Sequence, residues 1–308
     1  MSGITTFCFA ASYTVALLLE LSRLWFRSGI RGVVLLAFAG AGLLAHTLYL
    51  GYHAYQSSLA HVAPLSSAQA YYFCGAWLVA ALYLYALLSM PKVSSGLFLL
   101  PLVLLLIAAG SFESDQPFAE GYATQTWGMV HGIFLLLGYV AVGMGFVVGL
   151  MYLIQAHRLK KKLPLPTRFR LPALESLERA NHRATIWGAL LVGVGFLSGL
   201  ILKLIGVGEI PWSDPVIWRS AAMLGWLVAA AIFSAWYMPA QRGRKVAYLT
   251  IGSFAFLVAS IAISFWFPTA HKTDRAERML PGGEPLGFVN FTSSSLLLPS
   301  SSCIEVQS

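Results

Sequence analysis

Eight apolar segments occupy most of this sequence, and each approaches the length that a helix needs to cross a lipid bilayer. The hydrocarbon core of a bilayer requires about 20 apolar residues per helix, with a range of about 17 to 25. The segments cover residues 3–22, 32–52, 68–90, 95–111, 128–155, 184–205, 217–237 and 247–267. Since a backbone within lipid must satisfy its own polar groups, we expect each segment to be a helix.

Charged residues are too few to cover a soluble surface. Only 10% of the 308 residues are charged and 58% are hydrophobic, whereas soluble proteins carry about 25% charged residues. The N-terminus has no basic residue before its apolar run, so we interpret this run as an uncleaved first span. The sequence therefore predicts an all-α integral membrane protein, a bundle of about eight transmembrane helices.

The basic residues predict the orientation of the bundle. Fifteen of the 20 lysines and arginines fall in alternate connections, on one side of the predicted bundle. They are Arg23, Arg27, Arg31, Lys92, Arg158, Lys160, Lys161, Lys162, Arg168, Arg170, Arg179, Arg183, Arg242, Arg244 and Lys245. Short cytoplasmic loops are enriched in lysine and arginine, so we expect both termini to lie outside.

The C-terminal residues differ in composition from the rest of the chain. They are rich in serine, proline and glycine and show no sustained hydrophobic period. Such composition is typical of disordered segments. We therefore expect two parts, an eight-helix transmembrane domain over residues 1–270 and an external, disordered tail over residues 271–308.

Several function classes lack their minimum parts in this sequence. The net charge of +8 is gathered in short loops and not along a binding stripe, which argues against nucleic acid. Cys8, Cys74 and Cys303 form no CxxC pair, so thiol exchange and structural zinc are unsupported. No glycine-rich phosphate loop, HExxH or GxSxG motif is present, which argues against an NTPase or hydrolase. No span carries a clear mid-membrane charge, which disfavours a transporter.

Histidines near the predicted outer face are candidate metal ligands. Neutral imidazole is a common axial ligand of haem iron, and two axial ligands approach from opposite faces. His46 and His53 share one helix face about 10 Å apart along the axis and cannot clamp one iron. His131 and His271 end different spans at the same surface and could do so. The alternative is that His131 hydrogen-bonds a neighbouring helix and His271 is a solvated cap.

Aromatic residues accompany these histidines. Trp127 lies one turn before His131 on the same helix face. The stretch GEIPWSDPVIW over residues 208–218 places Trp212, Asp214 and Trp218 on the same outer side. This stretch is either an interfacial turn, since tryptophan favours the headgroup region and Asp-Pro starts turns, or a platform for a flat ligand.

The remaining polar and small residues have structural interpretations. Glu20 ends the first span near Arg23, from where it can reach the interface, and His157 and His182 are expected to be solvated in the basic connection. Glycines of the fifth and sixth spans favour close helix packing. They are Gly143, Gly145, Gly149, Gly188, Gly193, Gly195 and Gly199.

Five stretches in this order resemble the cytochrome c assembly family, which includes CcsA-like and HemX-like membrane proteins. They are HVAPLSSAQAYYFCGAW, SGLFLLPLVLLLIAAGSF, HGIFLLLGYVAVGMGFVVGLMYLIQAHRLKKK, LESLERANHRATIWGALLVGVGFLSGLI and RGRKVAYLTIGSFAFLVASIAISFWFPTAH. The resemblance runs from about the second span to His271.

The resemblance implies a haem-handling factor of a bacterial inner (plasma) membrane. In the family a tryptophan-rich outer segment holds haem between axial histidines, and haem passes to apocytochrome c. By position His131 and His271 match the axial ligands, and Trp212, Asp214 and Trp218 match the segment. Trp127 is an aromatic neighbour, and His46 matches a membrane histidine of some members.

Two departures from the family pattern affect the expected function. The tryptophan-rich segment is shortened, and Val216 and Ile217 follow the Asp-Pro where the family has Lys-Glu. The large partner domain that assists haem attachment is absent, so we expect weakly held haem, a second biogenesis subunit as partner and no independent catalytic activity. The alternative is a HemX-like membrane regulator or scaffold without haem transfer.

Overall fold

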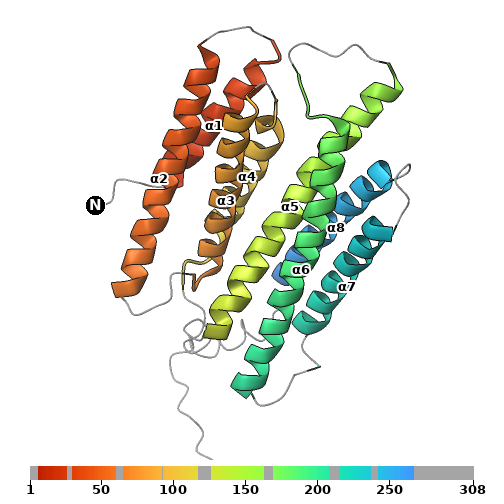
Figure 1. The fold of residues 1–308 in the computed structure, drawn as a ribbon. Helices are drawn as coiled ribbons and strands as arrows, with labels where there is room; N and C mark the ends of the chain where they lie inside the picture. The colour runs from red at the N-terminus through yellow and green to blue at the C-terminus, as the bar shows by residue number, and fades with distance from the viewer. Residues whose placement is uncertain are drawn as a thin grey trace, which may run out of the picture. The chain divides into compact units, whose positions relative to one another are not determined.

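The described part of the chain folds into eight α-helices and contains no strand. The computed structural model describes residues 6–25, 30–59, 65–91, 93–116, 126–162, 169–207, 212, 215–236 and 242–266. The helices are α1 (Thr6–Ser22), α2 (Arg31–Leu59), α3 (Ala68–Ser89), α4 (Gly96–Phe112), α5 (Thr126–Lys160), α6 (Leu174–Val207), α7 (Pro215–Trp236) and α8 (Arg242–Trp266) (Figure 1).

Six of these helices are long and apolar enough to cross a membrane, namely α2, α3, α5, α6, α7 and α8. Helices α1 and α4 are equally apolar but have 17 residues each, which is about the shortest length that spans a bilayer. The predicted all-helical, multi-pass architecture is therefore confirmed.

Helices α5 and α6 are longer than the sequence predicted. They contain 35 and 34 residues, which corresponds to about 50 Å each, against about 30 Å for a hydrocarbon core. Helix α6 begins at Leu174, ten residues before the predicted start of the span. The prediction that His182 lies in a solvated connection is therefore wrong, because this residue belongs to α6.

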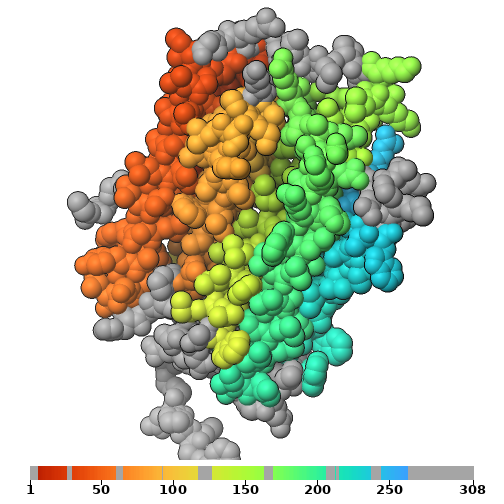
Figure 2. All heavy atoms as spheres, viewed as in Figure 1, coloured from red at the N-terminus to blue at the C-terminus, as the bar shows by residue number. Residues whose placement is uncertain are grey.

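The buried side chains form two clusters that meet at α5. The larger cluster joins the helices from α1 to α5 and includes single residues of α6 and α8; Phe9, Tyr13, Phe73 and Leu100 are among its most enclosed residues. The smaller cluster joins α5 to α6, α7 and α8 around Leu227. Helix α6 runs alongside α5 over most of its length (Figure 1), and its side chains cover much of the face shown in Figure 2.

Glycines allow these helices to approach closely, as the sequence predicted. A Cβ atom at Gly195 of α6 would lie 2.7 Å from Leu135 Cδ2 of α5, and one at Gly149 of α5 would lie 2.7 Å from Thr250 Oγ1 of α8. Contacts this short leave no room for a side chain. Within lipid, where apolar surface gains little from helix association, such close backbone packing stabilises the bundle.

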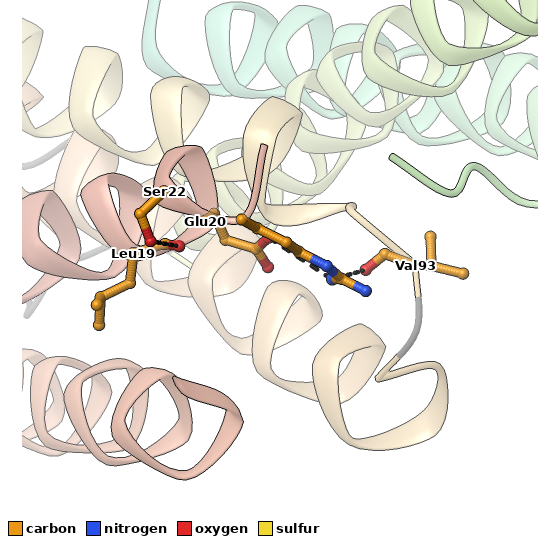
Figure 3. A network of polar contacts seen from close by, with 5 residues as sticks. Leu19, Glu20, Ser22 and Val93 are labelled. Carbon is orange, nitrogen blue, oxygen red and sulfur yellow. Dashed lines mark hydrogen bonds and ion pairs between the residues drawn. The ribbon is translucent and has the colours of Figure 1, made fainter. Parts of the chain in front are cut away.

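Glu20 does not reach the interface as expected. Its side chain is fully enclosed at the end of α1, 3.8 Å from the Arg23 guanidinium, which also donates to the carbonyl of Val93 at 3.4 Å (Figure 3). A Cβ at Gly96 would lie 2.8 Å from Glu20 Cγ, so α4 packs directly over the carboxyl group. This contact joins α1 to the connection between α3 and α4.

Candidate functional site

His131 lies in the second turn of α5, with its ring against α6. Its Nδ1 is 2.7 Å from the carbonyl oxygen of Gly195. A Cβ at Gly199 would lie 2.6 Å from His131 Cε1 and 2.7 Å from Nδ1, so the imidazole occupies space that only glycine leaves open. Gly195 and Gly199 are one turn apart on α6. Together they form a seat that fixes the ring.

This hydrogen bond determines which ring nitrogen is available. A carbonyl oxygen only accepts, so His131 Nδ1 carries the proton and donates it to Gly195. In neutral imidazole the other nitrogen, Nε2, then holds a free lone pair. Metal-ligating histidines commonly have this arrangement, with one N–H on a backbone carbonyl and the second nitrogen on the metal. The hydrogen bond of His131 to α6 is thus the alternative that the sequence left open for this residue, and it is compatible with metal ligation through Nε2.

Trp127 lies one turn before His131 and shares its helix, as the sequence predicted. Helix α5 begins at Thr126, so both residues belong to the first two turns. Side chains four residues apart lie on one helix face. The Trp127 side chain is 41% exposed, whereas His131 is half-buried. An exposed aromatic ring therefore accompanies the seated imidazole.

Trp212 and Trp218 form an ordered pair at the start of α7. The Trp218 indole Nε1 donates to the Trp212 carbonyl oxygen at 2.7 Å, and the ring centroids are 6.3 Å apart at an angle of 52°. The two side chains are 60% and 61% exposed. Two large apolar rings are thus held by a hydrogen bond while most of their surface stays accessible.

The first turns of α5, the end of α6 and the start of α7 lie at the same end of the bundle (Figure 1). His131, Trp127 and the Trp212–Trp218 pair are therefore on one side of the protein. Two further predicted residues, His271 and Asp214, lie outside the described residues.

His46 differs from these residues in its surroundings. Its side chain is fully buried, and the ring stacks on Phe9 with centroids 4.2 Å apart and planes 1° apart. Phe73 and Tyr13 approach the edges of the ring, with the Tyr13 hydroxyl 3.5 Å from Nδ1. Nε2 forms no hydrogen bond of ordinary geometry with a described residue. No iron could reach this ring without displacing its neighbours, so we do not place His46 in the site.

His53 lies apart from His46, although both belong to α2. It is half-buried and lines an apolar cavity of about 370 Å³ between α2 and α3, together with Tyr49, Phe73 and Trp77. His46 does not line this cavity. The two histidines of α2 therefore have separate surroundings.

The two histidines near the basic connection also differ from each other. His157 of α5 is exposed, as predicted. His182 of α6 is half-buried, and its Nδ1 lies 2.6 Å from Ser234 Oγ of α7. The first is a surface residue, and the second joins two helices.

The described residues contain no group of three or more histidine, cysteine or acidic side chains placed to hold a metal ion. Haem differs from such sites because its porphyrin supplies four ligands and the protein only the axial ones. Among the described residues, one seated histidine with nearby aromatic surface therefore matches what a haem site requires of a protein better than what a zinc site requires.

Sequence reasoning missed the residues that position His131. Gly195 and Gly199 were expected to favour helix packing, but not to receive the imidazole. The adjacent Gly132 packs against the Tyr71 ring of α3, where a Cβ would lie 2.7 Å from Cζ. The spacing of four between the α6 glycines was the available signal, since it places both on one helix face.

Comparison with known protein families finds a match to this sequence. The family model described as Cytochrome C assembly protein matches residues 36–271, which is more than half of the chain. The match includes α3 to α8, His131 and the Trp212–Trp218 pair. No curated protein matches the sequence in addition.

Proposed function

We propose a haem-holding role for this chain, which belongs to the cytochrome c assembly protein family. Membership of the family gives the protein a role in cytochrome c biogenesis. Within this role, the chain holds haem at the outer membrane face and delivers it to apocytochrome c. Haem is here the substrate and not a resident cofactor.

The seat of His131 carries the proposal. Its Nδ1 is occupied by the Gly195 carbonyl at 2.7 Å, which leaves Nε2 to act as an axial ligand. Because Gly199 also confines the ring, little rotational freedom remains to be lost on binding. His271 is the second proposed ligand. Ligation by neutral imidazole is reversible, as a delivery function requires.

The exposed tryptophans supply the remaining contacts in this proposal. Trp212 and Trp218 present apolar ring faces that are only partly buried against the protein, and aromatic stacking contributes about 0.5–1.5 kcal/mol beyond area burial. Asp214 follows Trp212 closely and could accept an N–H from a ligating histidine. Such a small aromatic surface predicts weak haem retention.

The membrane arrangement completes the proposal. Helices α1 and α4 also span the bilayer, giving eight spans with both termini outside, in a bacterial inner (plasma) membrane. The distribution of lysine and arginine supports this orientation. The chain itself has no catalytic activity, and a second biogenesis subunit completes the attachment of haem to apocytochrome c.

The topology can be tested with reporter fusions. A reporter fused near Lys161 should be cytoplasmic and one fused after His271 should be external. The reverse result at either site contradicts this topology.

The test is the absorbance spectrum of the purified protein with and without added haem. We expect a Soret band with bis-histidine character in the parent protein. His131→Ala and His271→Ala should lose most of the bound haem, and added imidazole should restore it. Trp212→Ala should reduce retention less, by about the contribution of one aromatic contact, roughly two- to twelvefold in affinity.

The control is His157→Ala, because this exposed histidine lies at the opposite end of α5. It should retain haem like the parent. The proposal fails if the parent binds no haem, or if the His131, His271 and Trp212 variants all bind it as the parent does.

A further inference from the structure

Arg158 is a partly buried positive charge without a carboxylate partner among the described residues. It lies half-buried in the last turn of α5, and its Nη1 is enclosed without a hydrogen-bond partner in the described part of the chain. No aspartate or glutamate occurs from residue 156 to residue 170. A partly enclosed, uncompensated charge is costly, and an anion in contact with the exposed part of this half-buried side chain would offset that cost.

The position of the Arg158 guanidinium is fixed by aromatic packing. Its Cζ lies 4.8 Å from the centroid of the Phe169 ring, a cation–π distance. The Phe169 ring in turn contacts Phe98 of α4, with centroids 6.3 Å apart. The backbone N–H of Ser94 donates a hydrogen bond of 2.9 Å to the carbonyl oxygen of the next residue, Arg170. The Phe169 ring, which lies against Arg158, is therefore packed on α4, and the backbone of Arg170 is hydrogen-bonded to Ser94, just before α4.

Further exposed cations are close to Arg158 and Phe169 in the sequence. Lys160, Lys161 and Lys162 end α5, and the Arg170 side chain is exposed beside Phe169. Lys162 has a φ of 49°, in the left-handed region, so the chain turns away from the helix axis here. The lysines would also be expected at a helix C-terminus. The guanidinium of Arg158, which packs on the Phe169 ring, distinguishes this surface from an ordinary basic loop.

The depth of Arg158 indicates what anion is available. The apolar run of α5 ends at Ile154, four residues earlier, so Arg158 lies about 6 Å beyond it along the helix. Because α5 is longer than the hydrocarbon core is thick, this end of the helix lies at or beyond the headgroup layer, which extends roughly 5–8 Å beyond the core. The abundant anions at this depth are the phosphates of phospholipids, whose oxygens match the planar donors of arginine.

From this geometry we infer that Arg158, with Arg170 and the lysines that end α5, forms a binding site for the phosphate of an anionic phospholipid. The Phe169 ring orients the guanidinium, and the lysines and Arg170 add attraction without fixed geometry. The site lies away from His131 at the other end of α5 and does not depend on haem binding. Bound lipid would stabilise the contacts of Phe169 and Arg170 with α4 and with Ser94.

The experiment compares lipid retention in the full-length protein by native mass spectrometry from a neutral detergent, with added phosphatidylglycerol or phosphatidylcholine. The parent protein should retain phosphatidylglycerol preferentially. Arg158→Gln should weaken this binding roughly ten- to a hundredfold, as expected for the loss of charge-assisted hydrogen bonds. Arg158→Lys should also weaken it several-fold, because the charge remains but the planar donors are lost.

The matched control is Arg179→Gln, which removes the same charge from the neighbouring helix α6. The Arg179 side chain is 64% exposed and has a carboxylate partner, Glu175, at 3.9 Å. This variant should bind phosphatidylglycerol like the parent. Phe169→Leu, which keeps apolar bulk without an aromatic face, should fall between the parent and Arg158→Gln.

Three results would overturn the inference. Equal losses in the Arg158 and Arg179 variants would indicate unspecific charge attraction. A parent-like Arg158→Gln protein would show that the guanidinium is not involved. Equal stabilisation against thermal unfolding by inorganic phosphate and by phosphatidylglycerol, at matched concentration, would mean that a free anion and not a lipid occupies the site.

Discussion

His46 and His131 both lie in helices of membrane-spanning length, but they make opposite kinds of contact. His46 is enclosed by Phe9, Tyr13 and Phe73 and has no exposed surface. His131 uses one nitrogen for the Gly195 carbonyl and is only half-buried. The first ring fills space in a core, whereas the second is held in one orientation at the end of a helix pair.

Under the proposed function, this difference separates a histidine that can act as a ligand from one that only packs in the core. A ligand requires a fixed proton on one nitrogen, a free lone pair on the other and an open approach. His131 meets the first requirement through a hydrogen bond that joins α5 to α6, and His46 lacks the approach. Substitutions at the two positions should therefore separate stability from haem retention.

The largest effect is expected for His46→Ala. Removing a fully enclosed ring leaves a cavity among aromatic side chains, which should lower the free energy of unfolding by about 2–5 kcal/mol. His46→Phe keeps a flat ring for stacking on Phe9 and should remain within about 1.5 kcal/mol of the parent. Unfolding in detergent micelles and the haem absorbance of the folded fraction should be measured together.

For both His46 variants, haem retention per folded molecule should equal that of the parent. A His46→Phe protein that is stable but loses haem would contradict the structural role and make the two histidines alike. His131→Ala should show the reverse pattern, with little haem and a fold destabilised only by about 1 kcal/mol, the contribution of its hydrogen bond to Gly195.

A smaller effect is expected for Gly199→Ala, which tests the seat without changing His131. The new Cβ would lie 2.6 Å from His131 Cε1, so the ring must move and its hydrogen bond to Gly195 must lengthen. Overpacking of this kind costs about 1–3 kcal/mol, and haem affinity should fall as the ligand loses its fixed orientation. Haem titration and thermal unfolding measure the two consequences.

Gly193→Ala on the same helix is the matched control. Its Cβ would meet Leu224 Cδ1 at 3.5 Å, an ordinary contact. This variant should bind haem like the parent. If both glycine variants reduced haem binding equally, the seat beneath His131 would not be the cause.

The sequence predicted the helices well where lipid determines their composition. Long apolar runs are required by the bilayer and are visible without any tertiary information. The extension of α6 back to Leu174 was missed because the stretch LESLERANHRA is polar. A helix segment outside the hydrocarbon core does not need apolar residues, so hydropathy does not detect it. The leucine, glutamate, arginine and alanine residues of this stretch nevertheless favour a helix.

The site was only partly predictable for a different reason. The pairing of Trp127 with His131 follows from a local spacing of four residues. The contact of His131 with Gly195 joins positions 64 residues apart and depends on the register between α5 and α6. The enclosure of His46 likewise depends on three helices. Neither can be read from one stretch of sequence.

A third histidine extends the comparison and gives the smallest expected effect. His182 Nδ1 lies 2.6 Å from Ser234 Oγ, which joins α6 to α7 outside both the aromatic core around His46 and the seat of His131. His182→Ala should lower the free energy of unfolding by about 1 kcal/mol, the net contribution of one hydrogen bond, and should leave haem retention unchanged. His157→Ala, on the exposed face of α5, should change neither quantity. Because removal of one partner leaves the other unsatisfied, Ser234→Ala and the double variant are needed to isolate the pair. A coupling energy near zero in this cycle would show that His182 and Ser234 do not stabilise each other. A loss of haem in His182→Ala would place a histidine from the opposite end of α6 in the haem site, which would contradict the proposed arrangement.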